Sequence, residues 1–193
     1  LQEFYTTEIT YWNQLNYIKV MYYDPLELAI QRNSPFVQPS DMDWFSNLSE
    51  LMEFSLNIIY QLQHYQQHFI SNSSSCSDCQ EIQIGKILCD MAESMSVFLH
   101  CALDYQANRK LMSEKKNNKG YMLYKDKLSL KRETRQFTLQ DYLIVPIQRI
   151  TRYGLLLADL EKHTEADDPD YKHIQIGRDI IHSLALAMNY AQK

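Results

Sequence analysis

The chain has 193 residues, enough for one domain with a substantial core, and carries a formal net charge of -5. An acidic chain binds nucleic acid poorly, so we expect no nucleic-acid partner. Four Gly and five Pro are few for a β-rich fold, which needs frequent turns, so the composition favours long helices. No apolar run is long enough to cross a membrane and no signal peptide is visible. These features predict a cytoplasmic protein that reaches the membrane periphery only through domains outside this chain.

The first segment, residues 1–23, has apolar residues at helical spacing along one face, up to Asp24-Pro25, where we expect the helix to end. Glu8 falls inside this apolar stripe. A carboxylate in such a position needs a partner, because burying an unpaired charge is costly. Two interpretations are open: an internal ion pair with a core-edge residue such as Arg149, or a place where the stripe leaves the core and meets another molecule.

The middle of the chain predicts two further long helices, at residues 43–69 and 84–108, each with apolar residues recurring on one face. A connector at residues 26–41 precedes them, and a polar, Ser-rich loop at residues 71–82 separates them. Residues 109–135 are basic and predict shorter helices with a solvated face.

The rest of the chain is expected to be organised around residues 137–164. Pro146 suits the first turn of a helix or a kink within one. At about 100° per residue, Gln148 and Arg152 project together from the side opposite the apolar arc, with Leu155 beside them. An amide, a guanidinium and an exposed leucine are typical of a small docking surface. A solvated helix with one stray surface leucine would give the same pattern.

A last helix is predicted at residues 170–192, with Asn189 just off its apolar stripe. The sequence thus predicts an all-α fold, an elongated bundle of about five to six long helices, in one domain covering residues 1–193. Cys76 and Cys79 form a C-x-x-C motif without the second pair of ligands that a zinc site needs, so we expect no metal and no cofactor. Neither a phosphate-binding loop nor a catalytic constellation occurs in the sequence, so we do not expect an enzyme.

Two motifs carry a resemblance to a known family. The central stretch follows the pattern P-x-Q-R-[IVL]-x-[RK]-Y-x-L-L-L-x-x-L-x-K-x-T through Pro146, Gln148, Arg149, Ile150, Arg152, Tyr153, Leu155, Leu156, Leu157, Leu160, Lys162 and Thr164. The amino-terminal TEITYWNQL follows T-E-x-x-Y-x-x-x-L through Thr7, Glu8, Tyr11 and Leu15. With these motifs the chain resembles, over nearly its whole length, the Dbl-homology domains, which are exchange factors for Rho-family small GTPases.

The resemblance implies a guanine nucleotide exchange factor that binds a Rho-family GTPase, preferably in its nucleotide-free form. Such a domain remodels the switch regions and promotes GDP release for GTP loading, with no covalent chemistry. By the same resemblance Glu8 contacts switch I, Gln148 and Arg152 meet the switches, and Asn189 contacts switch II. Ile144 matches a position that helps to select among Rho-family members. The expected GTPase-binding residues are therefore Glu8, Ile144, Gln148, Arg152, Leu155 and Asn189.

Two other functions compete with exchange. A catalytically silent Dbl-like scaffold would bind a GTPase or another protein without releasing nucleotide. A purely structural or membrane-shaping bundle would need a broad basic face, whereas this chain is net acidic and its basic residues concentrate in residues 109–135.

Overall fold

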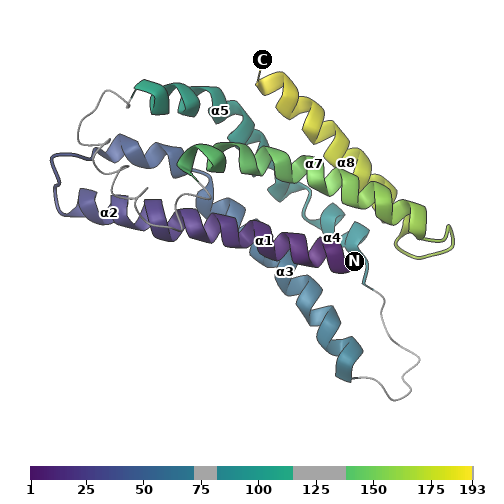
Figure 1. The fold of residues 1–193 in the computed structure, drawn as a ribbon. Helices are drawn as coiled ribbons and strands as arrows, with labels where there is room; N and C mark the ends of the chain where they lie inside the picture. The colour runs from purple at the N-terminus through teal and green to yellow at the C-terminus, as the bar shows by residue number, and fades with distance from the viewer. Residues whose placement is uncertain (72–81, 115–137, 193) are drawn as a thin grey trace.

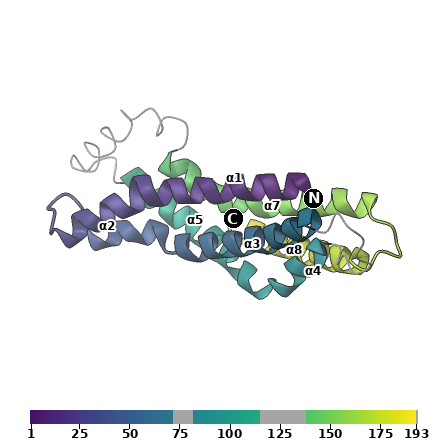
Figure 2. The same cartoon turned by 90° about the horizontal axis from the view of Figure 1, so that it is seen from below.

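The computed structural model describes residues 1–71, 82–114 and 138–192. Within these ranges every regular element is helical and no strand occurs, which confirms the predicted all-α fold. Five of the α-helices in this described part of the chain have 17 residues or more. Figures 1 and 2 show them as an elongated bundle, as expected from helices of this length.

The amino-terminal helix is longer than predicted. Helix α1 (Gln2–Ile18) runs through a π-helical turn (Lys19–Tyr23) directly into α2 (Asp24–Gln31), so the predicted end at Asp24-Pro25 is wrong. Pro25 lies in the first turn of α2, where its missing N–H costs little. The wider π-helical turn brings Lys19 Nζ within 2.6 Å of Asp24 Oδ1, five residues on, and this ion pair bridges the junction.

Between α2 and the next long helix, a 3₁₀ segment (Pro39–Phe45) begins with a capping box in which Asp41 accepts from the backbone N–H of Gln38. Helix α3 (Leu48–Ser71) follows and confirms the first predicted helix of the middle region.

The second predicted helix of the middle region, at residues 84–108, is interrupted. It consists of α4 (Ile84–Asp90), a short 3₁₀ turn (Glu93–Met95) and α5 (Ser96–Glu114). Met91 and Met95 at the break are buried like the apolar residues of both helices. Because the apolar stripe continues across the break, its periodicity gave no sign of the interruption.

The two carboxy-terminal helices, α7 (Leu139–His163) and α8 (Tyr171–Ala191), were both predicted. Thr138 and Asp141 form a capping box at the start of α7, and Pro146 lies inside that helix. The helices pack against each other, antiparallel, with Gly154 facing Ile181. Helix α1 lies beside α7 and α3 in both views (Figures 1 and 2).

Some predicted segments lie outside the described residues. These are most of the polar loop at residues 71–82, including Cys76 and Cys79, and most of the basic segment at residues 109–135. In the described part of the chain, no helix is both long and apolar enough to cross a membrane. The same residues contain no group of three or more His, Cys, Asp or Glu side chains that could hold a metal ion.

The start of α4 is clamped to the start of α8. Asp170, which precedes α8, accepts hydrogen bonds from the backbone N–H groups of Gly85, at 2.7 Å, and Lys86, at 2.9 Å. Its carboxylate thereby caps α4 from a position far away in the sequence. A Cβ atom on Gly85 would lie 2.4 Å from the backbone nitrogen of Ile174, so only glycine allows this approach.

We therefore expect Gly85→Ala to lower the free energy of unfolding by about 1–3 kcal/mol or more, because backbone atoms of α8 must move. Gly154→Ala is the matched control, since its Cβ would meet only Ile181 Cγ2, at an ordinary 3.5 Å. That variant should be unchanged or gain up to about 1 kcal/mol from helix propensity. Urea unfolding of both variants measures the difference, and equal stabilities would contradict the proposed clamp.

Candidate functional site

A solvent-open groove of about 240 Å³ runs between α1 and α7. One wall carries Thr7, Thr10, Tyr11 and Gln14 from α1, and the other carries Val145, Gln148, Arg149 and Arg152 from α7. Gln148 and Arg152, which the sequence placed on one patch, thus line the same groove.

Beneath the groove lies a buried charged network. Glu8 is fully buried, with 0% of its surface exposed, and Arg149 is 5% exposed. Glu8 Oε2 accepts hydrogen bonds from Arg149 Nη2 at 2.5 Å and from the Tyr153 hydroxyl at 2.8 Å. Its other oxygen accepts from the Ser55 hydroxyl at 2.5 Å. The network thus joins α1, α3 and α7 through one carboxylate.

Burial and charge set the protonation states in this network. Burial, reinforced by the Glu8 carboxylate, raises the pKa of Tyr153 well above its ordinary value, so its hydroxyl stays a donor. Burial alone would lower the pKa of Arg149, but Tyr153 and Glu8 outweigh it and raise that pKa. The guanidinium also lies over the rings of Tyr153, at 4.4 Å, and Tyr11, at 5.4 Å. Arg149 is therefore a fixed cation inside the bundle.

A second ion pair lies on the surface at one end of the groove. Arg152 Nη2 donates to Glu3 Oε1, and the two side chains are 44% and 61% exposed. The sequence did not single out Glu3 as a site residue. A signal for it exists, because Glu3, Thr7, Thr10 and Gln14 recur at steps of four, three and four, which places a polar row on one side of α1.

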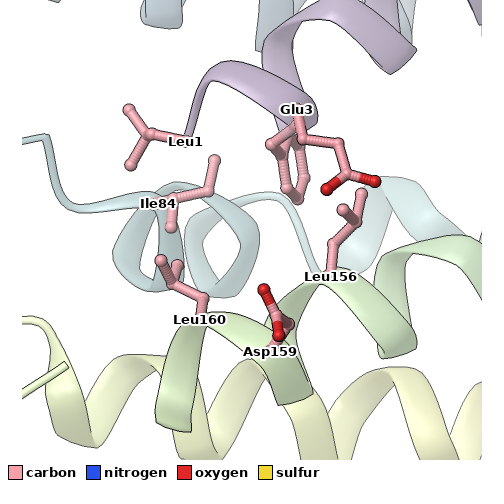
Figure 3. A pocket seen from close by; sticks show the side chains of 7 residues that line it. Leu1, Glu3, Ile84, Leu156, Asp159 and Leu160 are labelled. Atoms are coloured by element: carbon pink, nitrogen blue, oxygen red, sulfur yellow. The ribbon is translucent and has the colours of Figure 1, made fainter. Parts of the chain in front are cut away.

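A small pocket of about 50 Å³ lies on the other side of this ion pair, where the start of α1 faces α4 and α7. Figure 3 shows its apolar lining, including Ile84, Leu156 and Leu160, with the carboxylates of Glu3 and Asp159 nearby. Since this volume holds only a few waters, the larger groove is the better candidate for a binding site.

Two of the remaining predicted residues, Ile144 and Leu155, extend the surface of α7 beside the groove. Ile144, Gln148 and Leu155 follow one another by four and seven residues, so they share one side of α7, on which Gln148 is exposed and Leu155 is 60% exposed. Ile144 is half-buried.

Asn189 is exposed on α8. It follows Arg178 by eleven residues, about three helical turns, and Arg178 donates to Glu161 of α7. Asn189 is therefore on the same side of α8 as Arg178, and α8 lies on the opposite side of α7 from α1 (Figure 1). Asn189 does not line the groove between α1 and α7.

The sequence profile of the RhoGEF domain family matches residues 1–189. The chain belongs to the RhoGEF domain family. This agrees with the resemblance drawn from the two sequence motifs.

Curated relatives of this RhoGEF domain are much longer proteins. Rac guanine nucleotide exchange factor JJ of Dictyostelium discoideum is 26% identical over 179 residues, which is 91% of this chain and 14% of that protein. Rho guanine nucleotide exchange factor TIAM2 of Homo sapiens is 25% identical over 204 residues, covering 100% of this chain and 11% of that protein. The chain spans only a small part of these relatives.

Solved structures share the fold of this RhoGEF domain. A structure of the Vav1 exchange factor with its PH and C1 domains has a TM-score of 0.77 at 24% identity, over 99% of this chain and 48% of that one. A DH/PH fragment of PDZ-RhoGEF, solved in complex with human RhoA, has a TM-score of 0.78 at 18% identity, over 100% of this chain and 52% of that one.

Within this RhoGEF domain, Glu8 has the internal partner that the sequence left open as one of two interpretations, since its carboxylate binds Arg149. A contact between Glu8 and another molecule would require the carboxylate to give up three hydrogen bonds. The carboxylate that stands on the surface beside Arg152 is that of Glu3.

The carboxylates of Glu8 and Glu3 should differ sharply in how much they contribute to the free energy of unfolding. Glu8→Gln leaves Arg149 buried without a counter-charge, and we expect a loss of about 3–5 kcal/mol in the free energy of unfolding. Glu3→Gln removes an exposed ion pair, and we expect a loss of less than about 1 kcal/mol. Denaturant unfolding monitored by circular dichroism gives both values. A Glu8→Gln variant as stable as Glu3→Gln would show that the buried pair does not hold the bundle together.

Proposed function

We propose that this RhoGEF domain is a guanine nucleotide exchange factor for a Rho-family small GTPase. It binds the nucleotide-free GTPase best, remodels the switch regions and promotes GDP release for GTP loading, and it does no covalent chemistry. The observation that supports this most directly is the shared surface of α1 and α7, where Gln148, Arg152 and Leu155 are exposed next to Glu3. The printed names of the relatives, a Rac and a Rho exchange factor, and the RhoA complex of a structure with the same fold point to the same class of partner.

Exchange requires the domain to bind the nucleotide-free GTPase more tightly than the nucleotide-bound GTPase. A domain that binds the empty GTPase more tightly weakens nucleotide binding by the same factor, because the two equilibria are linked. A nucleotide held at picomolar Kd is bound by about 16 kcal/mol, so the contacts to remodelled switches must supply a large difference.

The structure suggests how the roles are divided. Arg152 and Glu3 are exposed charges of opposite sign, and both can make charge-assisted hydrogen bonds to a switch region. Gln148 offers an amide, while Leu155 and Ile144 offer apolar contact on the same side of α7. Asn189, exposed on α8, adds a contact to switch II away from the groove. Glu8 supports these residues from below by fixing Arg149, which lies between Gln148 and Arg152 in the sequence.

Arg152→Gln should reduce GTPase-specific nucleotide release by about tenfold to a hundredfold, the effect of losing a hydrogen bond to a charged group, while the fold stays intact. Release of a fluorescent GDP analogue from a panel of Rho-family GTPases measures this and finds the partner. Arg178→Gln is the matched control, because Arg178 is 43% exposed, close to the 44% of Arg152, and also pairs with a glutamate.

The panel of GTPases also distinguishes an exchange factor from a catalytically silent scaffold. If a GTPase binds the wild-type domain but its nucleotide release is not accelerated, the domain is a silent scaffold and the proposal fails. If Arg178→Gln loses as much activity as Arg152→Gln, the α1–α7 surface is not the site.

A further inference from the structure

Ser55 of α3 is a polar side chain in the middle of the hydrophobic core. It is fully buried, with 0% of its surface exposed, and Leu51 and Ile58, about one turn before and after it on α3, are also 0% exposed. A buried hydroxyl without an acceptor costs free energy, and alanine would suit both the helix and an apolar core better. The acceptor that explains a serine here is Glu8 Oε1, at 2.5 Å from the Ser55 hydroxyl.

The two oxygens of the Glu8 carboxylate have different partners. Oε2 accepts from Arg149 and Tyr153, whereas Oε1 accepts from Ser55. Because a carboxylate can rotate about the bond that joins it to its side chain, a donor on each oxygen is needed to fix its plane. Ser55 therefore holds the carboxylate in the orientation in which Oε2 faces the guanidinium of Arg149.

Removal of the Ser55 hydroxyl would take this donor away from a buried, charged oxygen. Leaving such an oxygen unpaired is costly, and the guanidinium of Arg149 is already in contact with the carboxylate and has several N–H donors. We expect the carboxylate to turn toward Arg149 with both oxygens. The guanidinium, which lies over the Tyr153 ring at 4.4 Å, must then change its own position.

This change reaches the surface through α7. Gln148 directly precedes Arg149 in the chain, Arg152 follows it by three residues, and both line the groove between α1 and α7. The described residues that line this groove come from α1 and α7, and Ser55 has no exposed surface. Ser55 therefore makes no contact of its own with a partner in the groove, and its influence on that partner is indirect.

We infer that Ser55 is a positioning residue of the exchange site, acting through Glu8 and Arg149. It keeps Gln148 and Arg152 in the orientation in which they meet the GTPase. A binding surface of this kind works only when its side chains are held close to the productive geometry, within about 0.5 Å. The inference rests on the proposed function, because it gives Ser55 a role in nucleotide exchange.

The first test uses the domain alone and needs no GTPase. Ser55→Ala should shift the NMR signals of the Arg149 Nε–H group and of the Gln148 and Arg152 side chains, because the Glu8 carboxylate turns. Ile58→Val is the matched control, since it removes one methylene from a fully buried side chain of the same helix and leaves the Glu8 hydrogen bonds in place. Its melting temperature should fall without those shifts.

The second test measures release of a fluorescent GDP analogue well below the melting temperature of each variant, where all of the domain is folded. Ser55→Ala should lower kcat by about three- to tenfold, the range of one net hydrogen bond, while Ile58→Val matches the wild type. In an Arg152→Gln background, Ser55→Ala should cost less than about a further twofold, because the charged side chain that Ser55 positions is already absent. A general loss of stability would instead lower exchange equally in both backgrounds.

If Ser55→Ala does not fold, Ser55→Cys replaces it, because a thiol is similar in size to a hydroxyl but is a weaker donor. Ser55→Cys must then show the same NMR shifts and the same selective loss of exchange. The inference is overturned if the Ser55 variant behaves like Ile58→Val in both tests, or if its loss of exchange is the same with and without Arg152.

The two tests also separate this inference from the proposed function. If no GTPase responds to the wild-type domain, the proposed function fails and the role of Ser55 in exchange fails with it, while the NMR shifts still establish that Ser55 positions Arg149. If the wild-type domain is active and the Ser55 variant exchanges equally well, the function stands and the inference is overturned.

Discussion

The buried hydrogen bonds of Glu8 are the interaction on which the rest of this structure depends. One carboxylate, with no exposed surface, receives donors from Arg149, Tyr153 and Ser55. A buried charge is tolerated only when its partners are well placed, so the network defines how α1, α3 and α7 sit relative to each other. Aromatic packing around it adds apolar contacts: Phe4 of α1 stacks on Tyr153 at 5.6 Å, and Phe98 of α5 meets the same ring edge-on at 6.3 Å, which brings a fourth helix to the junction.

This geometry explains how one short motif supplies both the core and the surface of the site. Arg149 points inward because it pairs with Glu8. On the same helix, Gln148 and Arg152 then face the groove and solvent. If Arg149 pointed outward, the helix would be rotated and the apolar residues Ile150 and Leu157 would leave the core, where they are 1% and 0% exposed. The inward arginine therefore fixes the rotation of α7.

Much of this could be predicted from the sequence, because helical periodicity reports which side of a helix is buried. It placed Gln148, Arg152 and Leu155 on the outer side of α7, and the structure confirms their exposure. It could not decide between the two interpretations of Glu8, since an apolar stripe does not reveal which neighbour meets it. It missed the break between α4 and α5, because buried Met91 and Met95 keep the stripe continuous.

The two glutamates of α1 show where sequence reasoning stops. The sequence singles out Glu8 because this residue interrupts an apolar stripe. Glu3 is one of several polar residues on the other side of α1, and only the packing of α1 against α7 identifies it. In the folded domain their environments are opposite: Glu8 is buried and accepts from three donors, whereas Glu3 is 61% exposed and accepts from one donor, Arg152. An exposed pair exchanges partners at little cost, while a buried one does not. The proposed exchange function, in which the GTPase is released once nucleotide reloads, uses both kinds of charge: a fixed one that keeps the surface rigid and a weakly held one that can change partners.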